Sequence, residues 1–267
     1  MESQIPYHTA LDWLAWQVEL GADEAIAEAP VNRFEAAAVP VPVPNPVATP
    51  ASTSAPAASA IAPPAEGADP VAEARKAATR AGDLAQLAAE MEGFAHCDLR
   101  HGARTFVFCD GNPAARVMIV GEAPGREEDM QGKPFVGRAG QLLDRMFDAI
   151  GLNRASPDAK EALYITNILP WRPPQNRDPS PAEIAMMLPF VQRHIDLAAP
   201  EVIVLMGNIS CQGLLGRRGI TRLRGTWQEV MARPAMPMFH PAFLLRQPPR
   251  KREAWADLLS IQSKLRG

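Results

Sequence analysis

The chain has 267 residues with a hydrophobic content of 47%, which is ordinary for a soluble globular protein. No apolar run reaches the roughly 18 residues of a membrane span, and no basic region followed by an apolar stretch opens the chain, so we expect neither a membrane segment nor a signal peptide. Cys97, Cys109 and Cys211 are an odd number without paired spacing, so the sequence indicates neither a disulfide framework nor a CxxC zinc site. A reducing cytoplasm is therefore the expected compartment.

The net charge of −3 conceals two parts of opposite charge. Residues 1–92 carry 4 Lys or Arg and 13 Asp or Glu, whereas residues 93–267 carry 23 basic and 17 acidic side chains. Arginine dominates the basic part, as expected of a surface that binds phosphate groups. A solvated basic surface without a nucleic-acid role is the alternative that charge alone leaves open.

The first 70 residues differ in composition from the rest of the chain. Apolar residues at helical spacing in 8–26, with Thr9 as a candidate N-cap, predict an N-terminal amphipathic helix within residues 1–29. This helix either packs on the main domain or docks on a partner protein. Residues 30–70 contain ten prolines and predict an extended, disordered linker. Strong helix formers after residue 70 then mark the start of one folded catalytic domain over residues 71–267.

Short apolar runs alternate with helical patterns from residue 115 onward. The runs that predict buried parallel strands lie at 115–121, 163–167, 201–207 and 236–240. Helical patterns follow at 140–152, 181–199 and 251–267. This alternation predicts an α/β fold, a three-layer α/β/α arrangement with a central, mostly parallel four-stranded sheet. In such sheets a ligand binds at the carboxyl ends of the strands.

A carboxylate, Glu122, follows the first of these strands in the segment GEAPG at 121–125. The segment is neither a GxGxxG dinucleotide motif nor a P-loop. Its glycines allow a ligand to approach the backbone, and the carboxylate could orient a water molecule or stabilise a developing cation. A solvated loop acid is the alternative for Glu122 taken alone.

Two further polar residues end predicted strands. Asn167 closes the strand at 163–167, and its amide can read a pyrimidine edge with one donor and one acceptor, although a turn residue that caps a strand is the alternative. His240 closes the strand at 236–240 and precedes an apolar segment that ends in Arg246. A lone histidine is more often structural, but this segment suits a wedge that enters a stack of bases.

Five segments occur in order: GEAPG at 121–125, PFVGRAG at 134–140, the strand that ends in Asn167, NRDPSPAE at 176–183 and HPAFLLR at 240–246. Through them the chain resembles the uracil-DNA glycosylase superfamily, most closely its family four, from about residue 94 to about residue 260. The resemblance implies the uracil-DNA glycosylase-like fold and a monofunctional enzyme of base excision repair. Such an enzyme flips uracil out of DNA and hydrolyses its N-glycosidic bond, leaving an abasic site.

Two other functions stay open beside this one. A related glycosylase with broader or shifted specificity would act on hypoxanthine or xanthine, because the width of the base pocket cannot be read from the sequence. A relative that binds DNA without catalysis is the alternative from another class. In each case we expect DNA as the partner, a monomer, and a cytoplasmic location that is nucleoid-associated if the source is bacterial.

The resemblance also implies two catalytic residues. Glu122 corresponds to the acidic residue that assists the attack of water and supports the positive charge on the sugar. His240 corresponds to the histidine that donates a hydrogen bond to the uracil oxygen as negative charge accumulates there. These roles agree with the charge separation expected when an N-glycosidic bond breaks.

Four residues match the uracil-binding positions of the family. Ala123 would offer its backbone to the base, and Phe135 would stack on the flipped uracil. Asn167 would read the uracil edge, and Glu128 would exclude the 5-methyl group of thymine. An extruded base needs such a pocket to offset the cost of unstacking it.

The DNA-binding residues implied by the resemblance follow His240. Leu244, Leu245 and Arg246 match the loop that fills the gap left in the duplex. The arginines that we expect on the phosphate-binding surface are Arg217, Arg218, Arg222, Arg224, Arg246 and Arg250.

Two departures from related branches affect the expected chemistry. Family four implies a [4Fe–4S] cluster held by four cysteines, and the matching positions here are Phe94, Cys97, Trp171 and Met187. Because such a cluster normally needs four thiolates, we predict that it is absent, that apolar packing replaces it, that Cys97 is a buried free thiol, and that no metal or other cofactor is bound. The branch that traps DNA covalently carries a nucleophilic histidine in an inserted loop, which residues 171–183 lack. Turnover is therefore expected.

Overall fold

The computed structural model describes residues 69–267. The helix predicted within residues 1–29 and almost all of the linker predicted for 30–70 lie outside the described residues. Within 69–267, no helix is both long and apolar enough to cross a membrane.

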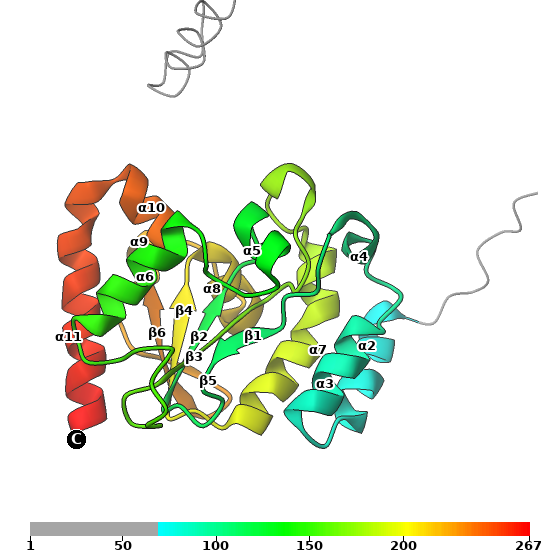
Figure 1. Ribbon diagram of the computed structural model, residues 1–267, viewed down its shortest axis with the longest axis horizontal. Coiled ribbons are helices and arrows are strands. Elements are labelled where there is room, and N and C mark those ends of the chain that lie inside the picture. The colour runs from blue at the N-terminus through cyan, green and yellow to red at the C-terminus, as the bar shows by residue number, and fades with distance from the viewer. Residues whose placement is uncertain (1–68) are drawn as a thin grey trace, which may run out of the picture. The chain divides into compact units, whose positions relative to one another are not determined.

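Six strands form a single mixed sheet in the order β1-β3-β2-β4-β6-β5 (Figure 1). They are β1 (Cys109–Gly111), β2 (Val117–Gly121), β3 (Leu163–Asn167), β4 (Val202–Met206), β5 (Gln228–Val230) and β6 (Arg233–Met238). The four central strands β3, β2, β4 and β6 are parallel and are the four that the apolar runs predict. The predicted number of strands was too small, because β1 and β5 add antiparallel edges. These edges have three residues each and are only partly buried, so they carry no continuous apolar run.

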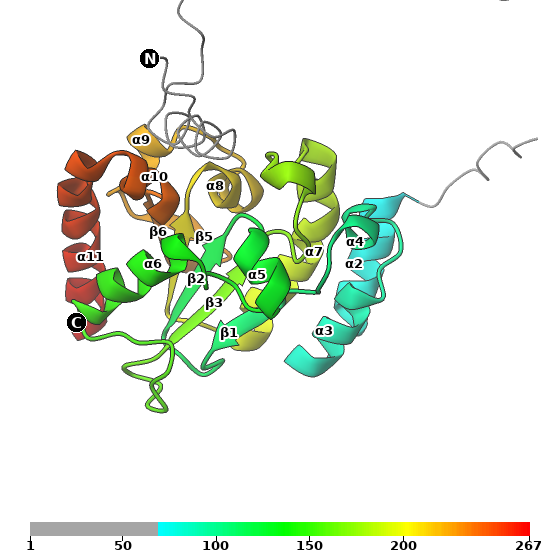
Figure 2. The same ribbon diagram turned by 45° about the horizontal axis from the view of Figure 1, so that its top comes forward.

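Helices cover both faces of the sheet, as expected for three layers (Figures 1 and 2). On one face α7 (Pro181–Ala198) and α8 (Asn208–Leu215) pack on the sheet, and α2 (Pro70–Arg80) and α3 (Leu84–Glu92) pack on α7. The other face packs against α6 (Arg138–Asp148), α10 (Pro241–Arg246) and α11 (Lys251–Arg266). Successive side chains of β2 alternate between the two cores, with Met118 and Val120 in one and Val117 and Ile119 in the other. Burial on both faces explains why these strands are apolar throughout.

The remaining elements are short and lie in the connections. They are α4 (Leu99–Gly102), α5 (Arg126–Gln131), α9 (Ile220–Leu223), and the 3₁₀ turns η1 (Pro174–Asn176) and η2 (Pro248–Arg250). Helix α7, the longest within residues 69–267, begins at a capping box. The Ser180 hydroxyl accepts from the Glu183 amide at 3.2 Å, and the Glu183 carboxylate accepts from the Ser180 amide at 2.7 Å.

The strand order places a switch point at the carboxyl end of β2. From β2 the chain moves to β3 on one side, whereas β4 lies on the other side. The connections that leave β2 and β4 therefore diverge over opposite faces of the sheet, and a crevice forms between them. This geometry predicts the ligand site at that edge.

Candidate active site

A pocket of about 650 Å³ opens at the carboxyl ends of the parallel strands. Residues from the connections after β2, β3, β4 and β6 line it, so four separate segments of the chain meet there. The structure brings together all six residues that the sequence assigns to catalysis and base binding: Glu122, Ala123, Glu128, Phe135, Asn167 and His240.

Asn167 is the residue at which β3 reaches the pocket, paired in register with Gly121 of β2. Its side chain is buried, with 3% of its surface exposed. Its Oδ1 atom has no hydrogen-bond partner, which is true of no other buried side-chain oxygen or nitrogen in residues 69–267. An unpaired buried acceptor costs about 1–3 kcal/mol, so this atom is suited to a ligand that brings its own donor.

Phe135 forms an aromatic wall of the pocket. Its ring centroid lies 5.4 Å from that of His240, with 31° between the ring planes. Its backbone φ of 53° lies in the left-handed region, which a bulky residue rarely adopts. A strained backbone at a pocket residue indicates that the surrounding structure holds this ring in place.

Gly121 is required for Asn167 and Phe135 to lie side by side. A Cβ atom at this position would stand 2.3 Å from Asn167 Oδ1 and 2.5 Å from the Phe135 ring. We expect Gly121→Ala to displace both side chains and to abolish measurable excision of a target base, while circular dichroism still reports a folded protein. Gly102→Ala is the matched control, because a Cβ there meets no atom within 4 Å. Full activity of Gly121→Ala would contradict this account of the pocket.

Glu122 follows Gly121 at the end of β2, where hydrogen bonds to the chain after β3 continue. The Leu169 amide donates to the Glu122 carbonyl at 3.0 Å, and this bond fixes the residue beyond the end of the strand. Burial, and to a smaller extent the charge of Asp178, raise the pKa of the Glu122 carboxyl to about 7, and Arg218 opposes the shift. Where it is ionised, above about pH 7, the carboxylate is therefore a poorly solvated anion, which suits it to face a developing positive charge.

His240 is the N-cap of α10, and the Ala242 amide donates to its Nδ1 atom at 3.2 Å. Burial lowers the pKa of His240 to about 4, with a contribution in the same direction from Arg246 and an opposing one from Glu128. The ring is therefore neutral at pH 7. Because its Nδ1 lone pair accepts a bond, the proton resides on Nε2, and the ring can donate a hydrogen bond from that atom.

Glu128 is buried at the pocket beside the residues predicted to bind the base, and its carboxylate accepts from three backbone amides. Oε1 accepts from Val136 at 2.9 Å and from Gly137 at 3.0 Å, whereas Oε2 accepts from Gly125 at 3.1 Å. The contacts of Glu128 thus join the GEAPG segment to the loop that carries Phe135. Exclusion of a 5-methyl group by this residue stays a prediction.

The structure corrects two of the predicted DNA contacts. Leu244 lies on α10 and is fully buried in the core that this helix shares with α6 and α11. The prediction that Leu244 acts as a wedge was therefore wrong. Arg224 forms an ion pair with the buried Asp257, and its Nη2 also donates to the Glu253 carbonyl at 2.9 Å, so this guanidinium is not free for phosphate. The sequence misses both contacts, because the partners lie far away along the chain.

The other predicted DNA contacts keep accessible side chains. Leu245 is partly exposed, and five arginines are exposed, namely Arg217, Arg218, Arg222, Arg246 and Arg250. Arg218 and Arg246 line the pocket itself. Sequence reasoning missed Asp178, which acts on Glu122 from the connection after β3, because nothing in the motif order shows that this loop folds over the pocket.

The fold and the pocket define an α/β protein with a pocket lined by an aromatic ring, an amide, carboxylates and a neutral imidazole at the carboxyl ends of its parallel strands. The sequence profile described as the uracil DNA glycosylase superfamily matches residues 108–259, and the chain belongs to this superfamily. The family and the fold class predicted from the sequence are thereby confirmed.

The alignments with curated relatives span most of the length of each relative. The type-4 uracil-DNA glycosylase of Archaeoglobus fulgidus is 36% identical over 187 residues, which are 67% of this chain and 91% of that protein. The type-4 enzyme of Saccharolobus solfataricus is 35% identical, covering 68% of this chain and 87% of that protein. The type-4 enzyme of Thermotoga maritima is 38% identical, covering 56% and 77%.

Proposed function

We propose that this chain is a uracil-DNA glycosylase that hydrolyses the N-glycosidic bond of deoxyuridine in DNA, as the first step of base excision repair. The observation that carries the proposal is the unpaired, buried Oδ1 of Asn167 beside the ring of Phe135. Uracil has a ring N–H donor on its pairing edge, whereas cytosine has only an acceptor at that ring nitrogen. The names of the relatives support the same substrate.

Recognition of the flipped base uses three side chains. Asn167 Oδ1 accepts the N3–H of uracil, and the ring of Phe135 stacks on the base. His240 donates from Nε2 to the adjacent carbonyl oxygen, O2. These contacts read the edge that the base would use in a duplex, so they offset the few kcal/mol needed to extrude it.

Cleavage breaks the bond between C1′ of the sugar and N1 of uracil. The electron pair leaves with the base, and the resulting negative charge is shared with O2, where the Nε2–H of His240 stabilises it. The sugar becomes an oxocarbenium-like cation, which the Glu122 carboxylate stabilises. Water adds its oxygen to C1′ and gives up a proton to Glu122. The uracil anion then takes up a proton from solvent and Glu122 releases its proton to solvent, so the products are neutral uracil and an abasic site.

The direct test uses the full chain and an end-labelled oligonucleotide with a single deoxyuridine. Treatment with the protein and then with alkali should cut the strand at that position, and an oligonucleotide with thymidine there should stay intact. Parallel substrates with hypoxanthine and xanthine test the broader specificity. If only these two substrates were cut, the assigned substrate would change from uracil to a deaminated purine. If folded protein cut none of the substrates, the result would favour a relative that binds DNA without catalysis.

The exposed arginines around the pocket supply the DNA surface of this proposal. Arg217, Arg218, Arg222, Arg246 and Arg250 are candidates for phosphate contacts, and Leu245 is the apolar residue left to enter the gap in the duplex. Affinity for DNA should fall steeply with salt if several of these arginines neutralise phosphates. We expect the protein to act as a monomer in the cytoplasm. If the source is a bacterium, we expect it to be associated with the nucleoid.

The iron–sulfur cluster implied by family four does not fit the residues present. Phe94, Cys97, Trp171 and Met187 are all buried in one apolar core, which offers a single thiol at these positions. Burial raises the pKa of the Cys97 thiol, which opposes formation of a thiolate ligand. In residues 69–267 no group of three or more His, Cys, Asp or Glu side chains could hold a metal ion. We propose that the enzyme works without the cluster.

This proposal predicts that protein purified without oxygen is colourless and contains no stoichiometric iron. Cys97→Ala should leave the rate of uracil excision unchanged, because the thiol serves only in packing. Metal analysis and single-turnover assays check the two expectations. Stoichiometric iron in the purified protein would contradict the proposal and show that the ligands were placed wrongly.

A further inference from the structure

The loop that carries Phe135 is held in a strained conformation from two sides. The left-handed backbone of Phe135 costs a non-glycine residue about 1–3 kcal/mol, so its surroundings must stabilise it. The N-terminal turn of α6 approaches this loop so closely that a Cβ at Gly140 would stand 1.8 Å from the Phe135 carbonyl oxygen. The position of the ring is therefore set by the backbone contacts of the loop.

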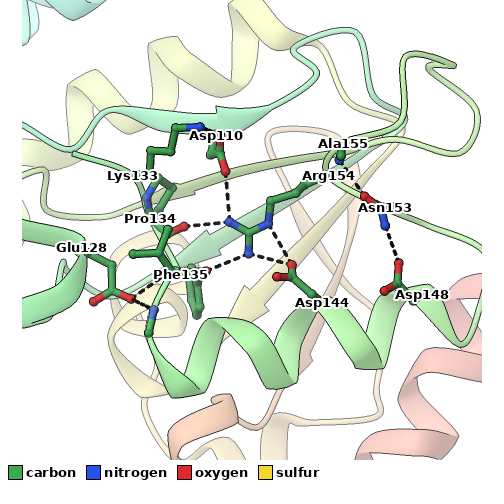
Figure 3. Close-up of polar contacts among 12 residues, drawn as sticks. Asp110, Glu128, Lys133, Pro134, Phe135, Asp144, Asp148, Asn153, Arg154 and Ala155 are labelled. Atoms are coloured by element: carbon green, nitrogen blue, oxygen red, sulfur yellow. Dashed lines mark hydrogen bonds and ion pairs between the residues drawn. The ribbon is translucent and has the colours of Figure 1, made fainter. Parts of the chain in front are cut away.

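Arg154 supplies the contacts on the carbonyl side (Figure 3). Its Nη1 donates to the Pro134 carbonyl and its Nη2 to the Phe135 carbonyl, each at 2.9 Å. The guanidinium is itself held by two carboxylates, with Nε 2.8 Å from Asp144 and Nη1 3.2 Å from Asp110. Only 14% of its side chain is exposed, so these bonds form away from most of the solvent.

Glu128 supplies the contacts on the amide side, where its Oε1 accepts from Val136 and Gly137. Arg154 thus binds the carbonyls of the peptide groups before and after Phe135, and Glu128, of opposite charge, binds the amide of the peptide group after it. Charge-assisted bonds of this kind are about twice as strong as neutral ones. A lysine could not replace Arg154, because two carbonyls and two carboxylates around one planar group require the forked geometry of a guanidinium.

We propose that Arg154 is a positioning residue for base recognition, which acts through Phe135 by fixing the ring opposite His240 where the flipped base stacks. The inference rests on the proposed function, since it assigns a role within the same pocket. Arg154 itself does not line the pocket. Its effect must therefore pass through the backbone of Pro134 and Phe135, and this requirement can be tested.

A double-mutant cycle separates this role from a merely structural one. The variants are Arg154→Gln, Phe135→Ala and the double variant. Two oligonucleotides are used that differ only at one site, where one carries non-hydrolysable 2′-fluoro-deoxyuridine and the other thymidine. The readout is the affinity for the first divided by the affinity for the second. Arg154→Gln should lower this ratio by about tenfold, the factor of one charge-assisted bond. In the Phe135→Ala background it should cause no further loss, because the ring through which it acts is gone.

Two variants control for stability and for charge. Arg116→Gln removes another arginine that binds a carboxylate, Glu201, and a backbone carbonyl, that of Leu265. Arg116 directly precedes β2, at the end of the strand opposite to the pocket. This variant should lower Tm and leave the affinity ratio unchanged. Arg154→Lys keeps the charge but not the fork, and it should give a ratio between those of the wild type and Arg154→Gln.

The outcomes distinguish this proposal from the proposed function. Suppose that the wild type binds the 2′-fluoro-deoxyuridine oligonucleotide more tightly than the thymidine one. If Arg154→Gln then has the same affinity ratio, or if the losses of the two single variants multiply in the double variant, the role of Arg154 is overturned and the proposed function stands. A wild type that neither discriminates nor cleaves deoxyuridine overturns both. If Arg154→Gln fails to fold, Asp144→Ala takes its place in the same cycle, because loss of this carboxylate frees the Nε of Arg154.

Discussion

Replacement of Glu122 by glutamine should lower the rate of uracil excision by about 100- to 10,000-fold at pH 8, the range expected when a catalytic acid or base is lost. Glutamine keeps the size of the side chain but neither stabilises the sugar cation nor takes a proton from water. The rate is measured in single turnover with a deoxyuridine oligonucleotide. Glu127→Gln is the matched control, since this neighbouring glutamate is exposed and does not line the pocket.

The pH dependence follows from the same carboxyl group. Burial raises the pKa of Glu122 from 4.5 to about 7. Because the ionised form is the active one, the wild-type rate should rise with pH through about 7 and level off above it. The Glu122→Gln variant should lose this rise. A wild-type rate that is flat between pH 6 and 8 would contradict the assignment, with these limits set at about one unit either side of that pKa.

Stability should change in the opposite sense. The raised pKa means that the folded state binds the Glu122 proton more tightly than the unfolded state does. Folding is therefore penalised as pH rises from about 4.5 through about 7, and the penalty is complete above that range. Glu122→Gln should then stabilise the protein by on the order of 1–3 kcal/mol at pH 8 and by little near pH 4.5. Urea denaturation at the two pH values measures the difference.

Replacement of His240 by alanine should lower the excision rate by about 100- to 1,000-fold, as expected for loss of one donor to a developing oxyanion. Loss of the cap on α10 should also cost about 1 kcal/mol of stability. His240→Gln should recover part of the rate, because its amide can donate a hydrogen bond. His101→Ala, an exposed histidine on α4, is the control.

The pH profile of the His240 variant separates its role from that of Glu122. Burial lowers the pKa of His240 to about 4, so the imidazole stays neutral throughout the range in which Glu122 titrates. The rise of rate near pH 7 should therefore persist in His240→Ala at the lower rate. Its disappearance would mean that the histidine, and not the glutamate, is the titrating group.

The sequence by itself determined the four central strands and the ends at which the site forms. Strands such as Val202–Met206 are buried on both faces, so each reads as an unbroken apolar run that identifies it without knowledge of its neighbours. Glu122, Asn167 and His240 each follow or end such a run, and parallel strands bring their carboxyl ends to one edge. The order of the motifs likewise identified the superfamily.

Only the tertiary structure decided which side chains face the pocket, the core or the solvent. HPAFLLR has the large apolar residues Phe243, Leu244 and Leu245 in succession, and the packing of α10 on α6 and α11 turned Leu244 inward and left Leu245 partly exposed. Arg224 is bound by Asp257, and Arg154 by Asp110, through contacts between residues remote along the chain. A local pattern records how strongly a segment is buried, but ion pairs and pKa values depend on which distant segments the fold brings beside it.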